Sequence, residues 1–430
     1  MKRTWIIVFG DLVSFLASFG LLIFIRFNPE SYSEAINIHT IPFTVLYITW
    51  VIIFYIFGLY DLLNIKPNIP YLKKWALALV TSFAVGMLLF YFIPSFGIAP
   101  KINLIIQVIS FGIISFLIRR LIYNLLAKTI RKPAILVGNS KPLIELEKII
   151  SGNPQIGLEI VGKFKDINEI KLDMNNFNGS TIILDQGAQV LNQNILNLYT
   201  NNIDITDTAK AYEKYLYKIP VEYIDLSFII ENVDIKKDIF YTLVSYVLNI
   251  TFALVVLVVT SPLIILSVIF IYINDKGPVF YIQQRVGLNG KVFKLYKLRS
   301  MKINAEENGA KWSTGNKDER VTKIGKVLRK THIDEIPQMI NILKGDIALV
   351  GPRPERPEFV ELLNKDIPYY SFRHIIRPGF TGWAQIKYRY ANTIEGSKEK
   401  FEYDLYYIKN QNIFLDIGII LRTIQIIFTH

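Results

Sequence analysis

The sequence contains no cysteine among its 430 residues and only four histidines. The absence of thiols excludes disulfide bonds and thiolate metal sites. His39, His332, His374 and His430 are scattered and lack the spacing of metal ligands. His332 stands beside two acidic residues, and we interpret it as a surface histidine at the start of a helix.

Charged residues are also scarce, at 20% of the chain, whereas hydrophobic residues make up 51%. This composition is too apolar for an ordinary soluble protein. The net charge of +12 suits an anionic membrane leaflet or phosphorylated substrates. No nucleic-acid-binding motif accompanies the charge, so we expect no nucleic acid as a partner.

Long apolar segments fill the first quarter of the chain: Trp5–Phe27, Pro42–Leu59, Trp75–Phe92 and Ile102–Ile118. Each is close to the ~20 residues that cross a bilayer as a helix. A cleaved signal peptide would not account for four of them. Basic residues flank the N-terminus, the second loop and the fourth segment, so both ends of a four-helix module at residues 1–130 are predicted to be cytoplasmic. Asp11 lies within the first segment, where a functional acid and an interfacial acid are both compatible with its position.

Residues 131–235 have a soluble α/β pattern. Residues 134–137, 158–162, 180–185 and 203–205 are predicted as strands, and residues 143–150 and 190–199 as helices. This alternation predicts a doubly wound parallel sheet of the Rossmann-like kind. Its first turn has one glycine, Gly138, where a dinucleotide fingerprint has three, which favours a structural or regulatory role over redox chemistry.

The segment Tyr246–Ile273 carries no charge, and its length alone predicts a fifth spanning helix. A full crossing would place the basic motifs that follow it outside, against the positive-inside rule. Ser261 and Pro262 lie in its middle, where proline removes a backbone hydrogen bond and bends a helix. Beyond it we predict a turn-rich run at 277–287, a strand at 292–298 and a loop at 302–322. Residues 414–428 are predicted as a helix, either at the membrane surface or in a core.

Residues 331–355 concentrate the chemistry. Four apolar residues recur there at helical spacing: Ile333, Ile336, Ile340 and Leu343. Gly345 is placed to end this helix, and Pro337 predicts that its first turn lies nearby. Asp334 and Glu335 are therefore expected at or just inside the helix N-terminus, where the dipole favours an ionised carboxylate. An ionised aspartate beside a phosphate site is what nucleophilic attack on phosphorus requires.

An N-cap role for Asp334 and a first-turn role for Glu335 would also explain this helix taken alone. The cations near it in sequence favour an anion site instead, because the guanidinium fork suits phosphate. They are Lys297, Arg299, Arg320, Arg329, Lys330, Arg353, Arg356, Arg377 and Arg389.

Five longer motifs occur in order along this half of the chain: Lys297–Met301, Leu328–Glu335, Leu343–Asp346, Val350–Pro354 and Arg377–Gln385. Together they resemble the bacterial sugar transferase family, the monotopic polyprenyl-phosphate glycosyl-1-phosphate transferases. An ordered set of this length is far more specific than a single short pattern. The resemblance is to the large form, with a membrane module and a Rossmann-like (CoA-binding-like) domain before an α/β monotopic catalytic domain at residues 240–430.

The resemblance implies transfer of a sugar 1-phosphate from a UDP-sugar to undecaprenyl phosphate, with Mg²⁺ as cofactor and UMP as product. This reaction would start exopolysaccharide, capsule or O-antigen assembly on the cytoplasmic face of a bacterial inner membrane. The segment 246–273 would be a re-entrant membrane helix, broken at Ser261 and Pro262. The large members also lead us to expect a homodimer.

The same resemblance implies roles for individual residues. Asp334 would attack the phosphorus that bears the sugar and form an aspartyl-phosphosugar, while Glu335 would bind Mg²⁺ or handle a proton. The expected phosphate clamps are Arg329, Arg353 and Arg389, supported by Lys297 and Arg299. No motif encodes the transferred sugar.

Two other functions are compatible with this organisation. A membrane-bound nucleotide-sugar dehydratase or epimerase would need the full glycine fingerprint and usually a Tyr-x-x-x-Lys motif. After Tyr212 and Tyr217, the lysine position holds Leu216 and Val221. A non-catalytic scaffold of polysaccharide assembly is disfavoured by the complete set of acidic and basic motif residues.

Overall fold

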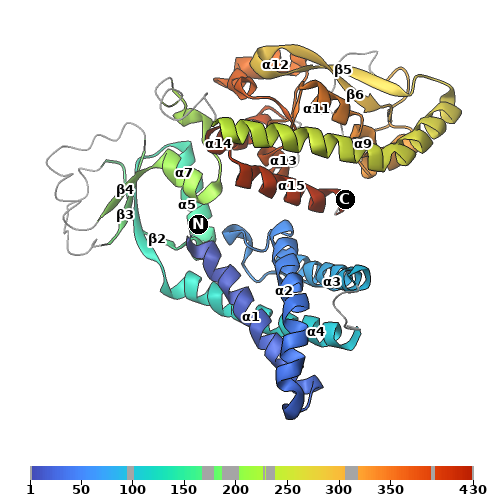
Figure 1. Cartoon of the computed structure of the whole chain (residues 1–430). Coiled ribbons are helices and arrows are strands. Elements are labelled where there is room, and N and C mark those ends of the chain that lie inside the picture. The colour runs from blue at the N-terminus through green and yellow to red at the C-terminus, as the bar shows by residue number, and fades with distance from the viewer. Residues whose placement is uncertain are drawn as a thin grey trace. The chain divides into compact units, whose positions relative to one another are not determined.

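The computed structural model describes residues 2–93, 101–166, 179–185, 203–225, 228, 238–305, 318–388 and 393–428. The chain divides into two compact units, Met1–Thr208 and Ala209–His430. Figure 1 shows both, and each is described by itself.

Four long helices open the first unit: α1 (Lys2–Arg26), α2 (Tyr32–Ile56), α3 (Ile69–Phe92) and α4 (Lys101–Asn124). Each contains one of the predicted apolar segments, and each is long and apolar enough to cross a membrane. They pack side by side around a core that includes Trp50, Phe54 and Phe111 (Figure 1). The described residues of the second unit include one further helix of this kind. The chain is therefore a membrane protein.

The acid in the first helix is paired with a buried arginine. Arg119 on α4 donates from Nε to Asp11 Oδ1 at 2.8 Å and from a second nitrogen to Oδ2. Tyr60 donates its hydroxyl to the same carboxylate at 2.8 Å, and Arg119 Nη1 donates to the Leu59 carbonyl at 2.9 Å. The two charged side chains are only 1% and 4% exposed. Asp11 thus stabilises the contact between α1 and α4, as a buried charge can when it is paired and hydrogen-bonded.

The first unit also contains a parallel sheet, in the order β2-β1-β3-β4. Its strands are β1 (Lys132–Val137), β2 (Leu158–Phe164), β3 (Thr181–Leu184) and β4 (Asp204–Asp207). Helix α5 (Lys141–Gly152) connects β1 to β2. The predicted parallel sheet and its first helix are confirmed, while the helix predicted at 190–199 lies outside the described residues.

The turn after β1 is closed by a carboxylate of the chain itself. Asp185 Oδ2 accepts from the backbone N–H groups of Asn139 at 3.2 Å and Ser140 at 2.7 Å. Gly138 has φ +129°, and a Cβ there would clash with Asp185. Dinucleotide-binding folds use amides at this turn to bind pyrophosphate. Here Asp185 takes these amides, which fits the absence of the glycine fingerprint.

The second unit is built on α9 (Ile239–Asp275), a helix of 37 residues. The predicted break at Ser261 and Pro262 is wrong, because α9 is continuous through both residues. Pro262 has no N–H to give the Val258 carbonyl, but Ser261 Oγ donates to that carbonyl at 2.8 Å. The hydroxyl replaces the missing backbone bond, so the helix persists, and its ribbon bends toward the C-terminal end (Figure 1).

A hairpin of β5 (Phe280–Val286) and β6 (Val292–Leu298) follows α9, so the turn-rich run predicted at 277–287 is largely a strand. The strand predicted at 292–298 is confirmed. The loop predicted at 302–322 lies mostly outside the described residues. The remaining elements are α10 (Lys323–Lys330), α11 (Gln338–Lys344), β7 (Ala348–Val350), α12 (Pro357–Asp366), β8 (Gly379–Thr381), α13 (Trp383–Lys387), α14 (Ile394–Asn410) and α15 (Ile413–Phe428).

Helix α9 lies against α11 and α15, where its Ala253 is buried in the core of this unit (Figure 1). Strands β7 and β8 pair in parallel beside this core. The predicted C-terminal helix is α15, and it has two different faces. Ile419 is fully buried in the core, whereas Phe414 is 81% exposed.

Residues 209–225, which include most of α7 (Thr208–Leu216), pack within the second unit. The carbonyl of Tyr217 accepts from Trp383 Nε1 at 2.9 Å. Lys218 is buried between Glu399 at 2.8 Å and Glu402 at 3.1 Å. Part of the segment that the sequence placed with the Rossmann-like domain therefore completes the core beside α14.

Candidate active site

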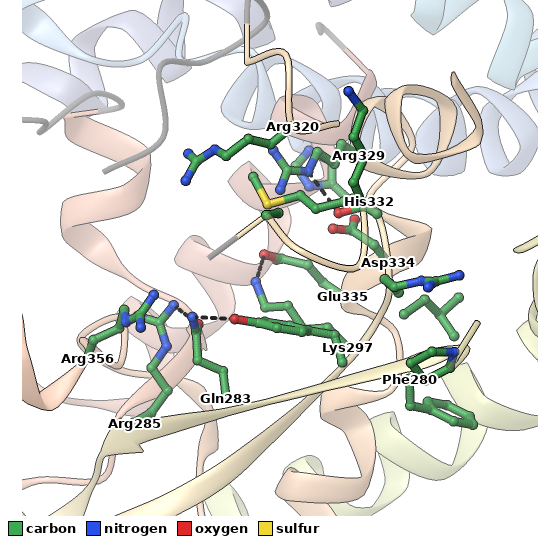
Figure 2. A pocket seen from close by; sticks show the side chains of 18 of the residues that line it. Phe280, Gln283, Arg285, Lys297, Arg320, Arg329, His332, Asp334, Glu335 and Arg356 are labelled. Atoms are coloured by element: carbon green, nitrogen blue, oxygen red, sulfur yellow. Dashed lines mark hydrogen bonds and ion pairs between the residues drawn. The ribbon is translucent and has the colours of Figure 1, made fainter. Parts of the chain in front are cut away.

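A cavity of about 490 Å³ in the second unit gathers most of the predicted site residues (Figure 2). Strand β6 and the loop after it supply Lys297 and Arg299, and α10 supplies Arg329. Asp334, Glu335 and Arg353 complete the predicted group. Arg389 lies outside the described residues. Ser261 and Pro262 lie within α9 and do not line the cavity.

The two acids lie on a short 3₁₀ turn, Ile333–Glu335, and not in the first turn of the α-helix as predicted. The α-helix begins only at Gln338, because Pro337 takes the N-cap position and has no N–H to donate. His332 precedes the turn in the left-handed region, with φ +56°. The predicted end of the helix is confirmed at Gly345, whose φ is +79°.

Glu335 is held by two cations at one oxygen. Its Oε1 accepts from Lys297 Nζ at 2.9 Å and from Arg353 Nη2 at 2.6 Å. Burial by itself would raise the pKa of Glu335, but the charges of Arg353 and Lys297 outweigh it and hold that pKa well below its usual value. Burial lowers the pKa of Lys297, and Glu335 opposes that effect. Glu335 is therefore ionised at neutral pH.

Asp334 has the opposite electrostatic character, although it is the adjacent residue. Its side chain is buried, and burial together with the charge of Glu335 raises its pKa to about 6. Lys297, Arg329 and Arg353 act against this increase. The ionised form of Asp334 was expected to be favoured by a helix dipole, but burial and the adjacent Glu335 shift its pKa the other way. A pKa near 6 still leaves about nine-tenths of the carboxyl groups ionised at pH 7.

The other predicted cations are fixed around these acids. Arg329 donates from Nε to Ser300 Oγ at 2.9 Å, which holds it at the cavity wall. Arg299 forms an ion pair with Asp275, the last residue of α9. The guanidinium groups of the predicted site are thus tied to different elements.

Three further arginines and one histidine of the cavity lining were not predicted as site residues: Arg285, Arg320, Arg356 and His332. Arg320 and Arg356 were counted only as nearby cations. His332 was interpreted as a surface residue, but it is half-buried in the cavity wall. Arg285 was missed because its segment was expected to be turns. Once β5 is a strand, its alternation places Tyr281, Gln283 and Arg285 toward the cavity.

The cavity offers carboxylate oxygens from Asp334, Glu335 and Glu355. No cluster of three or more acidic, histidine or cysteine side chains suited to a metal occurs in the described part of the chain. Mg²⁺ commonly binds one or two carboxylates and takes its other ligands from substrate phosphates and water. The acids therefore fit a magnesium ion that a phosphate-bearing substrate shares, rather than an ion caged by protein alone.

An ionised aspartate among cations, in a cavity at the end of an apolar helix, suits nucleophilic chemistry on a phosphorylated substrate. Figure 2 shows Asp334 and Glu335 between two basic groups, with Arg285 and Arg356 on one side and Arg320 and Arg329 on another.

The part of the chain that contains this cavity also matches known proteins. Residues 240–430 match a family model described as bacterial sugar transferase. A UDP-N-acetylgalactosamine-undecaprenyl-phosphate N-acetylgalactosaminephosphotransferase of Aeromonas hydrophila is 43% identical over 189 residues, or 44% of each chain. A UDP-glucose:undecaprenyl-phosphate glucose-1-phosphate transferase of Caulobacter vibrioides is 35% identical over 186 residues, which cover 43% of this chain and 69% of that protein.

A Xanthomonas campestris protein with the same name as the Caulobacter relative is 28% identical over 314 residues. That alignment covers 67% of this chain and 65% of the Xanthomonas protein, so it extends beyond the second unit. The chain thus spans less than half of the Aeromonas relative and just under two thirds of the Xanthomonas one.

Proposed function

Because this chain belongs to the bacterial sugar transferase family, we propose that it transfers a sugar 1-phosphate from a UDP-sugar to undecaprenyl phosphate. The products are undecaprenyl-diphosphate-sugar and UMP, and the reaction starts assembly of a polysaccharide. One observation carries the proposal: the buried Asp334 carboxylate lies among cations in a cavity at the end of a long apolar helix. A nucleotide-sugar dehydratase would instead need its pyrophosphate turn, which Asp185 occupies.

In the first step, an Asp334 oxygen attacks the phosphorus that bears the sugar. The bond from this phosphorus to the oxygen bridging to UMP breaks, UMP leaves with that oxygen, and an aspartyl-phosphosugar remains. In the second step, a phosphate oxygen of undecaprenyl phosphate attacks the same phosphorus. The bond to Asp334 breaks and the carboxylate is restored, so the protein is unchanged after one turnover.

The cations around Asp334 lower the barrier by offsetting the negative charge of two phosphate-bearing substrates. Arg329 and Arg353 are proposed as phosphate clamps, with Lys297 and Arg299 in support, and Arg389 keeps this role from its family motif. Glu335 orients Lys297 and Arg353 through its shared oxygen. It is also the proposed ligand of Mg²⁺, which when bound would neutralise diphosphate charge.

The same proposal includes the arrangement in a bacterial inner membrane. Residues 1–130 form a four-helix transmembrane module and residues 131–208 a Rossmann-like domain. Residues 240–430 form the catalytic domain, and residues 209–225 pack with it. Helix α9 is continuous but bent, and we propose that it enters the membrane and returns at this bend, with both ends cytoplasmic. The chain is also proposed to form a homodimer. Since the chain lacks cysteine, single cysteines at Ile239 and Lys276 give a direct test. A membrane-impermeant thiol reagent should label both from the cytoplasmic side only, and labelling from opposite sides would contradict the re-entrant arrangement.

The reaction itself is tested by UMP release from detergent-purified protein with undecaprenyl phosphate, Mg²⁺ and a panel of UDP-sugars. The panel includes UDP-glucose and UDP-N-acetylgalactosamine, because the relatives' names differ in the sugar. We expect release with at least one sugar, and no release from Asp334→Asn. A matched control, Asp366→Asn, changes an acid at the end of α12 that does not line the cavity. Silence across the panel from folded protein would contradict the proposed reaction and favour a scaffold.

A further inference from the structure

The cavity has one apolar end. Phe280 and Ile303 line it and are 50% and 59% exposed. Figure 2 places Phe280 on the far side of Lys297 and Glu335 from Arg285 and Arg356. The opposite end is polar, because Arg285 donates to Gln283 at 2.5 Å and to the Pro354 carbonyl at 3.0 Å there. The two ends therefore suit ligands of different character.

The apolar end is joined to the end of α9. Arg299 pairs with Asp275, the last residue of that helix. A Cβ at Gly277, two residues later, would clash with the Arg299 guanidinium and lie 2.9 Å from Ile303 Cδ1. Arg299 and Ile303 thus pack directly against the chain that leaves α9.

The surface of α9 leads up to this end with apolar side chains. Phe270 and Ile273, in its last two turns, are 55% and 69% exposed. A ligand with a long hydrocarbon chain would find exposed apolar side chains on the last turns of α9 and again at Ile303 and Phe280. Its anionic head would meet Arg299, which lines the cavity beside Ile303.

We propose that Phe280 and Ile303 hold the isoprene units next to the phosphate of the acceptor, while Arg299 receives that phosphate from the α9 side. The inference rests on the proposed function and deepens it, because it gives the two substrates separate entrances. The acceptor enters from α9, and the nucleotide donor occupies the end near Arg285 and Arg356. Both phosphates can then approach Asp334 without the nucleotide crossing the apolar entrance.

The test uses single cysteines in the full-length, otherwise cysteine-free chain. Ile303→Cys reports on the proposed entrance. Ile282→Cys is the matched control, since Ile282 is 53% exposed on β5 but does not line the cavity. Alkylation by N-ethylmaleimide is followed in detergent micelles with undecaprenyl phosphate, undecaprenol or UMP. We expect undecaprenyl phosphate alone to slow alkylation at Ile303→Cys at least fivefold, and no probe to change Ile282→Cys by more than about 1.5-fold.

Each other outcome overturns the inference. Protection of Ile303→Cys by UMP would place the donor at this end. Equal protection by undecaprenol, or of Ile282→Cys, would mean that the lipid acts through the micelle without recognition of its phosphate. No protection at all would place the acceptor elsewhere. Failure of the proposed function would appear separately, as absence of UMP release from wild-type protein, whereas the alkylation rates need no turnover.

A second measurement examines the same entrance through kinetics. Phe280→Ser should raise the KM for undecaprenyl phosphate at least tenfold, because the isoprene units lose their apolar contact. The KM for the UDP-sugar should stay within twofold, because the donor binds at the other end. Ile282→Ser, two residues further along β5 and outside the cavity lining, should leave both KM values within twofold. An equal rise of both KM values in Phe280→Ser would contradict separate entrances.

Discussion

Two buried groups of charges in this protein have opposite organisation. In the helical bundle, one carboxylate and one guanidinium, Asp11 and Arg119, form a pair that is almost fully enclosed by protein. In the cavity, Asp334 and Glu335 face a larger number of cations, and the group borders open space of about 490 Å³. The bundle pair is complete by itself, whereas the cavity group is arranged to receive additional negative charge.

Whether a buried charge is fully paired distinguishes a structural role from a candidate functional role better than its burial does. Asp11 and Asp334 are 1% and 7% exposed, so exposure alone would class them together. The carboxylate of Asp11 is satisfied by Arg119 and Tyr60. Asp334 instead has a pKa raised to about 6 by burial and by Glu335. A group that the fold leaves in an unfavourable environment is a better candidate for chemistry than one that the fold satisfies.

Replacing each aspartate by asparagine compares the two groups directly, and the largest expected effect is on turnover in Asp334→Asn. Asp334→Asn should lower turnover at least about 10³-fold, because it removes the proposed nucleophile. Its Tm should stay equal or rise by a few degrees. The folded-state pKa of Asp334 exceeds that of a free aspartate, so its ionisation above pH 6 opposes folding, and asparagine removes this effect. UMP release and thermal unfolding at pH 7.5 measure the two quantities.

Asp11→Asn should show the reverse pattern. Arg119 would remain buried without a counter-ion, and breaking such a pair costs about 3–5 kcal/mol. We expect a fall in Tm of roughly 10 °C. Turnover per folded molecule should remain within about threefold of wild type. Loss of turnover in folded Asp11→Asn would mean that the bundle charges take part in the reaction.

Replacing both partners of an ion pair together compares the two charge groups again, with a smaller expected effect. The double variant Asp11→Leu with Arg119→Met should recover most of the stability lost by either single change, because apolar residues can replace a buried ion pair. The corresponding cavity variant, Lys297→Met with Glu335→Gln, should stay about 10²-fold below wild type in turnover, since transition-state charge has lost its partners. A double-mutant cycle in Tm and in kcat compares the two groups. Recovery of turnover in the cavity double variant would show that Lys297 and Glu335 only neutralise each other and do not contribute to the reaction.

The sequence predicted the parts of the fold that depend on repeated patterns. The four apolar segments, the parallel sheet and the end of α11 at Gly345 are all present. The sequence did not reveal side-chain hydrogen bonds that offset a locally unfavourable residue. The break expected at Pro262 is absent because the Ser261 hydroxyl bonds to Val258. Such a bond depends on one side-chain rotamer, which periodicity does not encode.

The sequence motifs predicted several residues that gather at the cavity, but they did not predict all of the residues that line it. Asp334, Glu335, Lys297 and Arg353 meet as expected. Arg285 was missed because the turn-forming residues of its segment suggested loops where β5 forms. The pairing of β5 with β6 over seven positions outweighs the local preferences of that segment.

A smaller effect is expected at the backbone that presents the cavity acids. Asp11 and Arg119 lie on regular helices, whereas Asp334 follows His332, which has φ +56°. Glycine and asparagine adopt this conformation readily and valine does not, at a difference of about 1–2 kcal/mol. His332→Gly and His332→Asn should keep kcat within about threefold, and His332→Val should lower it about tenfold with an unchanged KM for UDP-sugar. Equal losses in all three variants would assign the role to the imidazole rather than to the backbone.

The smallest expected effect concerns a buried charge cluster that lies outside the cavity. It tests whether two acids sharing one lysine affect stability without affecting turnover. Glu402 shares the buried Lys218 with Glu399, and burial raises the pKa of Glu402 to about 7, with Glu399 adding to the rise and Lys218 opposing it. Because this pKa lies above that of a free glutamate, the stabilising protonated form is complete below about pH 4.5 and is lost as the pH rises through 7. Glu402→Gln should therefore lose about 2–4 °C less in Tm than wild type between pH 5 and pH 8, with turnover unchanged. Parallel Tm curves would show that Lys218 neutralises both acids, and a pH-dependent change in turnover would join this cluster to the site.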